Sequence, residues 1–443
     1  MCYNYIMKRM SDYSYHRGIV LRLYPSFRQT SLIKRNSGCA RFVYNRLIAI
    51  GNEIHDLKKC RIYSRPVSER LDYLETIFCD AKELKNAVPF LNEPGIDSDM
   101  IANEILNYRN AWRQYREVPG SHIPVFHRKS NECSYNTSNH YNYKQYKNIQ
   151  GMREGSIRFE DNNHLVLPML GRIRFKGSKK DVAALLARTD ETRIGSARIG
   201  IDSCGSCYVS LKLASDAPFY DALPATGKAV GIDLNLRNFL WDSDNACVDN
   251  PKYRKNASEK LAKAQRKLSM MAEHNIDHYD SRRRPVYTKP LQECRNYQKQ
   301  RLKVSELHSR IRNQRKDFMY CIAKEEVKNH DFIFAEDLKV NNLLKSRRLA
   351  NAISDVGWSE FLSILSWEAE KHGKLFMKVV PQNTTQTCSV CGYVSSGNER
   401  ITLNMEEWIC PECGTYHVRD YNASRNILAK GTEILRKTGL YAI

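Results

Sequence analysis

The chain has 443 residues, of which 42% are hydrophobic, so it is long enough for several domains and is not a disordered polymer. It carries 70 Lys and Arg against 49 Asp and Glu, and this net charge of +21 predicts a polyanionic partner, most often nucleic acid. A membrane surface is the competing polyanion. However, no segment approaches the roughly 18 apolar residues of a spanning helix, and "MCYNYIMKRM" lacks the apolar core of a signal peptide. We therefore expect a soluble intracellular protein with no membrane partner.

The first half of the chain predicts three zones. Residues 16–25 ("HRGIVLRLYP") indicate a β-rich start that ends at a proline. Residues 29–118 place apolar side chains at three- and four-residue spacings, which is typical of helices. From 124 to 213 the pattern changes to short strands and turns. The segment "SDAPFYDALPATG", rich in proline and small residues, then predicts a domain boundary near 226.

The second half predicts alternating strands and helices. A strand is expected at 229–240, a long basic helical region at 252–328, a second strand at 331–336 and an amphipathic helix near 354–372. A cysteine-rich segment and a final helix complete the chain.

Four of the fourteen cysteines form two CxxC pairs with eighteen residues between them, and these are Cys388, Cys391, Cys410 and Cys413. Each CxxC pair lets two thiolates bind one tetrahedral ion from a tight turn. The spacing predicts a structural zinc ribbon, with an iron site or a coincidence as the alternatives. Cys204 and Cys207 have no second pair, and we expect them to be free structural thiols.

Three acidic residues occupy the ends of predicted elements. Asp233 lies in the strand "KAVGIDLNLRNFL", Glu336 ends the strand "FIFAE", and Asp420 begins the final helix. Taken singly, each is most simply a solvated strand residue or a helix-start acid. Taken together, three carboxylates can hold two divalent ions about 4 Å apart, which clamp the attacking and leaving oxygens of a phosphodiester. Magnesium suits this role because it prefers oxygen ligands.

Several blocks of the sequence resemble one known family. "GIDLNLRNF", "FIFAEDL" and "HVRDYNASRNIL" resemble the three RuvC-like motifs of TnpB, the transposon-encoded RNA-guided nuclease, and of its compact type V CRISPR relatives. "RLYPSFRQTSLIKRNSGCARFVYN" resembles the opening of the family, and "LPMLGRIRFKG", "ISDVGWSEFLSIL" and "VVPQNTTQTCSVCG" are similar to further blocks in the expected order. The resemblance covers nearly the whole chain. The departures are Tyr421, where the family often has another residue type, and the extension over residues 1–15.

The resemblance implies a multidomain α+β fold. The expected parts are a β-rich, barrel-like wedge domain, a helical recognition domain inserted in it, a RuvC-like (RNase H-like) nuclease domain, and a zinc ribbon that binds target nucleic acid. Their expected limits are, in the same order, 1–28 with 124–225, then 29–123, then 226–382 with 417–443, and 383–416.

The resemblance also implies an activity, namely RNA-guided, magnesium-dependent cleavage of DNA. Carried over by position, Asp233, Glu336 and Asp420 are the catalytic triad that holds two Mg²⁺ ions, and the four paired cysteines hold one structural Zn²⁺. The implied partners are a guide RNA, from a transposon end or a CRISPR array, and double-stranded and single-stranded target DNA, which is cut beside a short flanking motif. The expected location is the prokaryotic cytoplasm, on the nucleoid when DNA is bound.

Two alternatives to this activity remain open. A nuclease-inactive RNA-guided repressor would have lost a carboxylate, whereas all three stand here. A non-enzymatic zinc RNA-binding protein would show no metal-dependent cleavage.

Further residues are candidates for nucleic-acid contacts. Arg419 lies between the cysteine pairs and the triad and is a candidate for contact with the scissile strand. In the basic helical region, a surface that grips the guide–target backbone competes with a merely solvated charged face, and the candidates there are Lys263, Arg266 and Arg312. Tyr63 and Ser98, with the neighbourhood of Tyr44, are candidates for reading the flanking motif, although packed tyrosines are an equally good interpretation.

Overall fold

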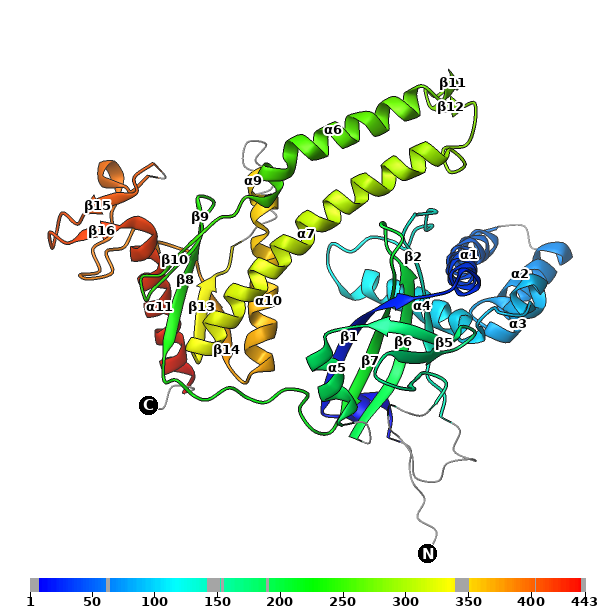
Figure 1. Cartoon of the computed structure of the whole chain (residues 1–443), viewed down its shortest axis with the longest axis horizontal. Helices are drawn as coiled ribbons and strands as arrows, with labels where there is room; N and C mark the ends of the chain where they lie inside the picture. Colours follow the sequence, from blue (N-terminus) through cyan, green and yellow to red (C-terminus); the bar gives the residue numbers. More distant parts are fainter. Residues whose placement is uncertain are drawn as a thin grey trace, which may run out of the picture. The chain divides into compact units, whose positions relative to one another are not determined.

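The computed structural model describes residues 8–60, 64–141, 152, 155–188, 191–338, 350–402 and 404–439 (Figure 1). The chain divides into two compact units, Met1–Phe219 and Tyr220–Ile443, and the division falls inside the segment "SDAPFYDALPATG". The finer limits of the four expected domains remain predictions. Within the described part of the chain, no helix combines the length and the apolarity needed to cross a bilayer.

The first unit contains a seven-stranded antiparallel sheet. Its first strand, β1 (Tyr15–Tyr24), buries alternate residues and lies between β7 and β5. The strand order is β2-β6-β7-β1-β5-β4-β3, so β1 from the start of the chain pairs with strands from much later in the sequence. The later strands are β2 (Cys133–Ser138), β3 (Arg158–Phe159), β4 (His164–Leu167), β5 (Gly171–Lys176), β6 (Thr192–Ile201) and β7 (Cys207–Ser215).

Most helices of the first unit occupy the region where the periodicity predicts them, but the helix at Lys179–Leu186 lies in the stretch 124–213, for which short strands and turns were expected. The long helix α1 begins with a capping box, in which the Gln29 backbone N–H donates to Ser26 Oγ (3.2 Å) and the Ser26 N–H donates to Gln29 Oε1 (2.9 Å). Helix α1 packs against α4 and β2. The helices are α1 (Phe27–Lys58), α2 (Arg65–Ile77), α3 (Ala81–Ala87), α4 (Ser98–Glu117) and α5 (Lys179–Leu186), with short 3-10 turns at Met10–Asp12 and Pro89–Asn92.

The second unit is built on a five-stranded mixed sheet with the order β10-β9-β8-β13-β14. Three strands form an antiparallel meander, and the last two run parallel to β8. The strands are β8 (Ala229–Leu234), β9 (Asn238–Asp242), β10 (Cys247–Asp249), β13 (Phe332–Glu336) and β14 (Leu375–Val379). The prediction of a single strand at 229–240 is therefore wrong. A turn divides it, because the Asn235 side chain accepts the Arg237 N–H (2.9 Å) and so bends the backbone.

Both faces of this sheet are covered by helices. Helices α7 (Arg295–Asn329), α9 (Ala350–Val356) and α10 (Trp358–Lys371) pack on one face, and α11 (Arg419–Thr438) packs on the other (Figure 1). Successive residues of β13 point to opposite faces, so Ile333 packs with α7 and α10 while Phe334 packs with α11. This double burial explains why "FIFA" is a continuous apolar run.

Two glycines allow α11 to lie directly on the sheet. A Cβ at Gly231 of β8 would lie 2.2 Å from the Ser424 carbonyl oxygen and 2.5 Å from the Leu428 nitrogen. A Cβ at Gly431 of α11 would lie 2.2 Å from the Phe334 ring. Since real Cβ atoms do not approach this closely, glycine at both positions sets the distance between helix and sheet.

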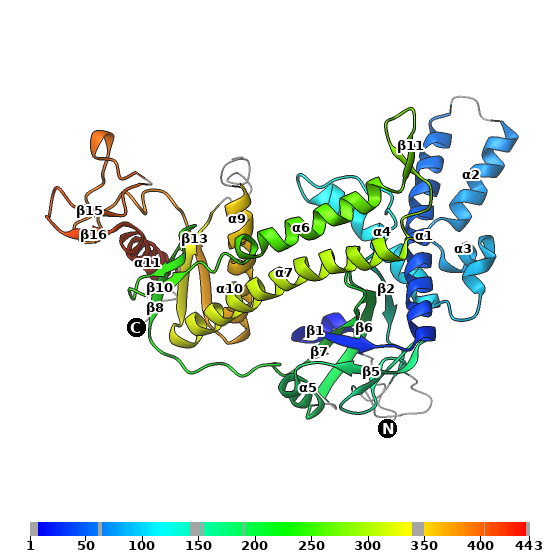
Figure 2. The same cartoon turned by 45° about the horizontal axis from the view of Figure 1, so that its top comes forward.

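The basic helical region expected at 252–328 consists of two helices, and a β-hairpin that the sequence did not predict separates them. Helices α6 (Tyr253–Glu273) and α7 run side by side, and the short strands β11 (Ile276–Tyr279) and β12 (Pro285–Tyr287) form a hairpin at their shared end (Figure 2). Asp280 causes the interruption, because its carboxylate accepts the backbone N–H groups of Arg282 (2.9 Å) and Arg284 (2.8 Å) and closes a turn.

Gly231→Ala should destabilise the second unit, because the added methyl group must push α11 off the sheet. Such overpacking typically costs about 1–3 kcal/mol, measurable by chemical denaturation. The matched control is Gly18→Ala in β1, where a Cβ would meet nothing within 4 Å. Equal free energies of unfolding for the two variants would contradict the close packing of α11.

Candidate active site and metal centre

The three predicted acids lie on adjacent elements of the second unit. Asp233 stands near the end of β8, and Glu336 is the last residue of β13. These strands are parallel, with Ala335 opposite Ile232, so the next residues, Glu336 and Asp233, stand at the same edge of the sheet. Asp420 lies in the first turn of α11, which packs across β8. The fold thus brings together residues that are far apart in the sequence.

The electrostatics of Asp233 reflect this convergence. Burial raises the pKa of Asp233 well above its usual value, the negative charges of Glu336 and Asp420 raise it further, and Arg419 opposes the shift. Burial also raises the pKa of Glu336, against the opposing effects of a Thr384 hydrogen bond and the Lys430 charge. A nearby positive charge would favour the ionised form of Asp233 against these effects.

Glu336 and Asp420 each accept hydrogen bonds from neighbouring side chains. Thr384 is 2% exposed, and its hydroxyl donates to the carboxylate of Glu336. On Asp420, Arg419 Nε donates to Oδ1 (2.8 Å) and Asn235 Nδ2 donates to Oδ2. The sequence reasoning did not find Thr384 or Asn235 as site residues. The only sequence signal for Asn235 is the preference of asparagine for turns.

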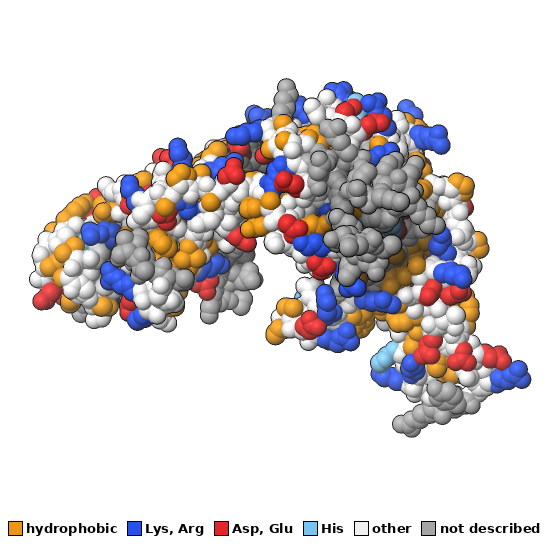
Figure 3. Space-filling view, turned by 90° about the horizontal axis from the view of Figure 1, so that it is seen from below, with side chains coloured by type: hydrophobic (Ala, Val, Ile, Leu, Met, Phe, Trp, Pro, Cys, Tyr) orange, Lys and Arg blue, Asp and Glu red, His pale blue; other side chains and the backbone are white. Residues whose placement is uncertain are grey.

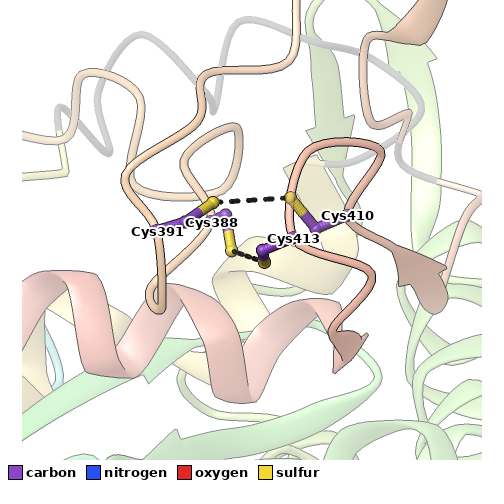
Figure 4. Close-up of side chains that lie close together, drawn as sticks. All are labelled: Cys388, Cys391, Cys410 and Cys413. Atoms are coloured by element: carbon purple, nitrogen blue, oxygen red, sulfur yellow. Dashed lines mark hydrogen bonds between the residues drawn. The ribbon is translucent and has the colours of Figure 1, made fainter.

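The four paired cysteines form a compact cluster (Figure 4). Their ligand atoms all lie within 4.8 Å of one another, with Sγ–Sγ distances of 3.7 Å for Cys388–Cys413 and 3.6 Å for Cys391–Cys410. Four sulfurs at about 2.3 Å from a tetrahedral ion would be about 3.8 Å apart, so the cluster fits an ion such as zinc. Among the described residues, this is the one group of His, Cys, Asp and Glu that meets this spacing, so the carboxylate oxygens of the triad are spread more widely.

The backbone builds this cluster from two equivalent turns. Gly392 follows one cysteine pair and Gly414 follows the other, with φ of +80° and +72°. The N–H groups of these glycines donate to the carbonyls of Cys388 and Cys410, both at 2.9 Å. His417 supports the cluster from β16 (Tyr416–Val418), where its buried ring lies 3.1 Å from the Cys388 sulfur.

The ribbon is bonded directly to the start of α11. The buried Asn422 side chain accepts the Ser389 N–H (2.8 Å) and donates to the Thr387 carbonyl (2.8 Å). Asn426 donates to the carbonyls of Thr384 (2.8 Å) and Thr387 (2.6 Å). The first cysteine turn is therefore hydrogen-bonded to the helix that carries Asp420. The segment that leads into this turn also contains Thr384, whose hydroxyl donates to Glu336.

The second arm of the ribbon is tied to the same helix start. The Arg419 N–H donates to the Glu406 carbonyl (2.8 Å), just before β15 (Glu407–Ile409), and Glu406 also forms an ion pair with Arg237. The Arg419 side chain is only 12% exposed and is engaged with Asp420 and the Met405 carbonyl. Its contact with a scissile phosphate remains a prediction.

The other candidate contact residues lie outside this site. Lys263 and Arg266 are exposed on α6, Arg312 is exposed on α7, and the Ser98 hydroxyl accepts a hydrogen bond from Lys85 (3.1 Å). Tyr63 lies outside the described residues. Lys and Arg side chains are spread over the face shown in Figure 3 and interspersed with acidic ones, so charge alone does not locate a nucleic-acid path.

The surroundings of Tyr44 agree with the interpretation that it is an ordinary packed tyrosine. It is 5% exposed and stacks on His127 with ring centroids 4.0 Å apart. The adjacent Asn45 exchanges two hydrogen bonds with the His127 backbone, at 2.7 and 3.0 Å.

Three protein families match segments of the chain. They are described as a helix-turn-helix domain (residues 10–60), a probable transposase (210–347) and a Cas12f1-like TNB domain (358–427). A relative from Streptomyces pristinaespiralis, named "Putative RNA-guided DNA endonuclease", is 35% identical over 230 residues, which cover 52% of this chain and 51% of that protein. A relative from Escherichia coli (strain K12) with the same name, InsQ, is 24% identical over 444 residues, covering 97% of this chain and 94% of that protein. Together, these matches support assignment to the TnpB family.

One solved structure supports the fold of this chain. The cryo-EM structure of a Cas12f1–sgRNA–target DNA complex has a TM-score of 0.53 at 12% sequence identity and covers 93% of this chain and 98% of that one. The chain therefore has the mixed α+β fold of a compact Cas12-like effector, with a TNB domain at its cysteine cluster.

We expect the protein to carry about one zinc per molecule, because four thiolates saturate one tetrahedral ion. Cys413→Ser should remove the ion and free the ribbon segment from α11. Amide hydrogen exchange should then rise roughly tenfold at residues 384–389 and 419–426, since each lost hydrogen bond is worth about 1 kcal/mol. Elemental analysis and hydrogen-exchange mass spectrometry measure the two effects.

The control for this experiment is Cys321→Ser, which changes an exposed free cysteine of α7. A zinc-free wild-type protein would contradict the assignment of the cluster. A zinc-free variant with unchanged exchange would contradict the tie between ribbon and helix.

Proposed function

We propose that this chain is an RNA-guided DNA endonuclease whose chemistry is carried by Asp233, Glu336 and Asp420. The observation that supports this most strongly is their convergence at one edge of the five-stranded sheet. An antiparallel meander followed by two parallel strands, with α11 on one face, is the arrangement expected of a RuvC-like (RNase H-like) nuclease domain. Acids at the ends of neighbouring strands and at a helix start are well placed to share divalent ions.

The guide and the target follow from the relatives and from the charge of the chain. Curated relatives carry the name of an RNA-guided DNA endonuclease, and the solved complex contains a guide RNA and target DNA. The net charge of +21 supports binding to two polyanions. We infer that the guide is a transposon-end RNA or a CRISPR RNA, and that base pairing reads the target while the protein reads only a short flanking motif.

The residues of the site fit two magnesium ions. Burial and the charges of Glu336 and Asp420 raise the pKa of Asp233, so bound cations would favour its ionised form, and carboxylate oxygens are the ligands that magnesium prefers. When bound, such ions would stabilise the charge on the attacking and leaving oxygens of the phosphodiester. Around them, Thr384 orients Glu336, and Arg419 orients Asp420.

The cysteine cluster has a supporting role in this proposal. One Zn²⁺ would hold the ribbon rigid, and the ribbon would then fix the first turns of α11 through Asn422 and Asn426. A nuclease-inactive repressor remains the alternative activity, but no acid of the triad has been lost here.

Asp233→Asn should abolish cleavage and leave guided DNA binding nearly intact, because the carboxylate acts in the chemical step. We expect the cleavage rate to fall by at least about a hundredfold, since even the partners of metal ligands are worth 10–100-fold. Cleavage and R-loop formation should be measured side by side with the guide RNA that copurifies. Glu433→Gln, an exposed acid on α11, is the control. Cleavage at the wild-type rate by Asp233→Asn would exclude Asp233 from the site.

Replacing Lys263, Arg266 and Arg312 together by alanine should weaken guide binding and flatten its salt dependence. Each phosphate contact contributes about 0.7–0.9 to the slope of log K against log salt, so three contacts should lower it by about 2–3. Filter binding at several salt concentrations measures the slope. An unchanged slope would mean that these side chains form only a solvated face.

A further inference from the structure

The Asn235 side chain is hydrogen-bonded at both ends. Its Oδ1 accepts the Arg237 N–H (2.9 Å), and its Nδ2 donates to Oδ2 of Asp420. Because the turn uses the carbonyl oxygen of the amide, the orientation of the side chain is determined, and the NH₂ group faces the carboxylate. Asn235 thus connects the turn after β8 with the first turn of α11, 185 positions later in the chain.

The two oxygens of Asp420 are held from different elements. Arg419, which donates to Oδ1 at 2.8 Å, belongs to the same helix as Asp420 and moves with it. Asn235 belongs to the turn that directly follows the strand of Asp233. Of these two donors, Asn235 is therefore the one that fixes Asp420 relative to Asp233.

We propose that Asn235 is a positioning residue that sets the separation between Asp233 and Asp420 and thereby the affinity of the site for divalent cations. This inference rests on the proposed function, in which both acids hold such ions. A carboxylate oxygen that accepts one hydrogen bond keeps a lone pair for a cation, and partners of this kind orient metal ligands. A neutral amide also places the carboxylate without adding a positive charge that would compete with the cation.

The chain contains a matched asparagine that forms a turn only. Asn250 accepts the Lys252 N–H with its Oδ1 (3.0 Å), as Asn235 does with Arg237, but its Nδ2 donates to the Leu236 carbonyl (3.1 Å). Asn250 therefore has the same type of turn and tethers the same loop, without touching a carboxylate.

The experiment compares Asn235→Ala, Asn235→Ser and Asn250→Ala in the full-length protein. Serine at 235 keeps an acceptor for the turn but is too short to reach Asp420, so it separates the turn from the contact. Binding of Mn²⁺ to the protein is measured by calorimetry, and cleavage with the copurified guide is measured as a function of Mn²⁺ concentration. Thermal unfolding shows whether each variant is folded.

We expect both Asn235 variants to bind Mn²⁺ about 10–100-fold more weakly and to need correspondingly more Mn²⁺ for half-maximal cleavage, as is typical when a partner of a metal ligand is lost. Cleavage at saturating Mn²⁺ should recover most of the wild-type rate. Asn250→Ala should bind Mn²⁺ like the wild type even if its thermal stability falls.

The results separate this inference from the proposed function. Wild-type affinity in Asn235→Ser, or equal losses in the Asn235 and Asn250 variants, would overturn the inference while leaving the nuclease assignment intact. Absence of cleavage by a wild-type protein that binds Mn²⁺ would overturn the nuclease assignment, and weaker binding by the Asn235 variants would then still support the positioning role.

Discussion

The close packing of α11 on the five-stranded sheet is the constraint on which the candidate site depends. Gly231 and Gly431 remove the side chains that would hold helix and sheet apart. The helix can then place Asp420 at the edge where β8 and β13 present the other two acids. A bulkier residue at either glycine would move one carboxylate while the other two remained on the sheet, and positioned groups tolerate a shift of only about 1 Å.

The ribbon extends this constraint across the site. It contacts α11 through the buried Asn422 and through Asn426, and it contacts Glu336 through Thr384. These contacts come from a segment of a few residues that leads into the first cysteine turn. A structural ion in the cluster would therefore order the surroundings of two of the three acids.

The sequence predicted the parts of the site whose signals are local. The CxxC spacing predicted the cysteine cluster, and the apolar strand before Glu336 and the family motifs predicted the three acids as site residues. The contributions of Asn235 and Thr384 could not be predicted, because each depends on a hydrogen bond between segments that only the fold brings together. The turn at Asn235 and the hairpin at Asp280 were missed for a different reason, since apolar periodicity continues on both sides of each and outweighs a single turn-forming residue.

The central claim is that three acids, held by one helix and one sheet edge, share two divalent ions. Electron paramagnetic resonance of the guide- and DNA-bound protein loaded with Mn²⁺ tests it most directly. The account predicts a spin-coupled pair of ions about 4 Å apart, and loss of the coupling in Asp420→Asn. A single uncoupled ion in the wild-type complex, or an unchanged coupled pair in that variant, would contradict it.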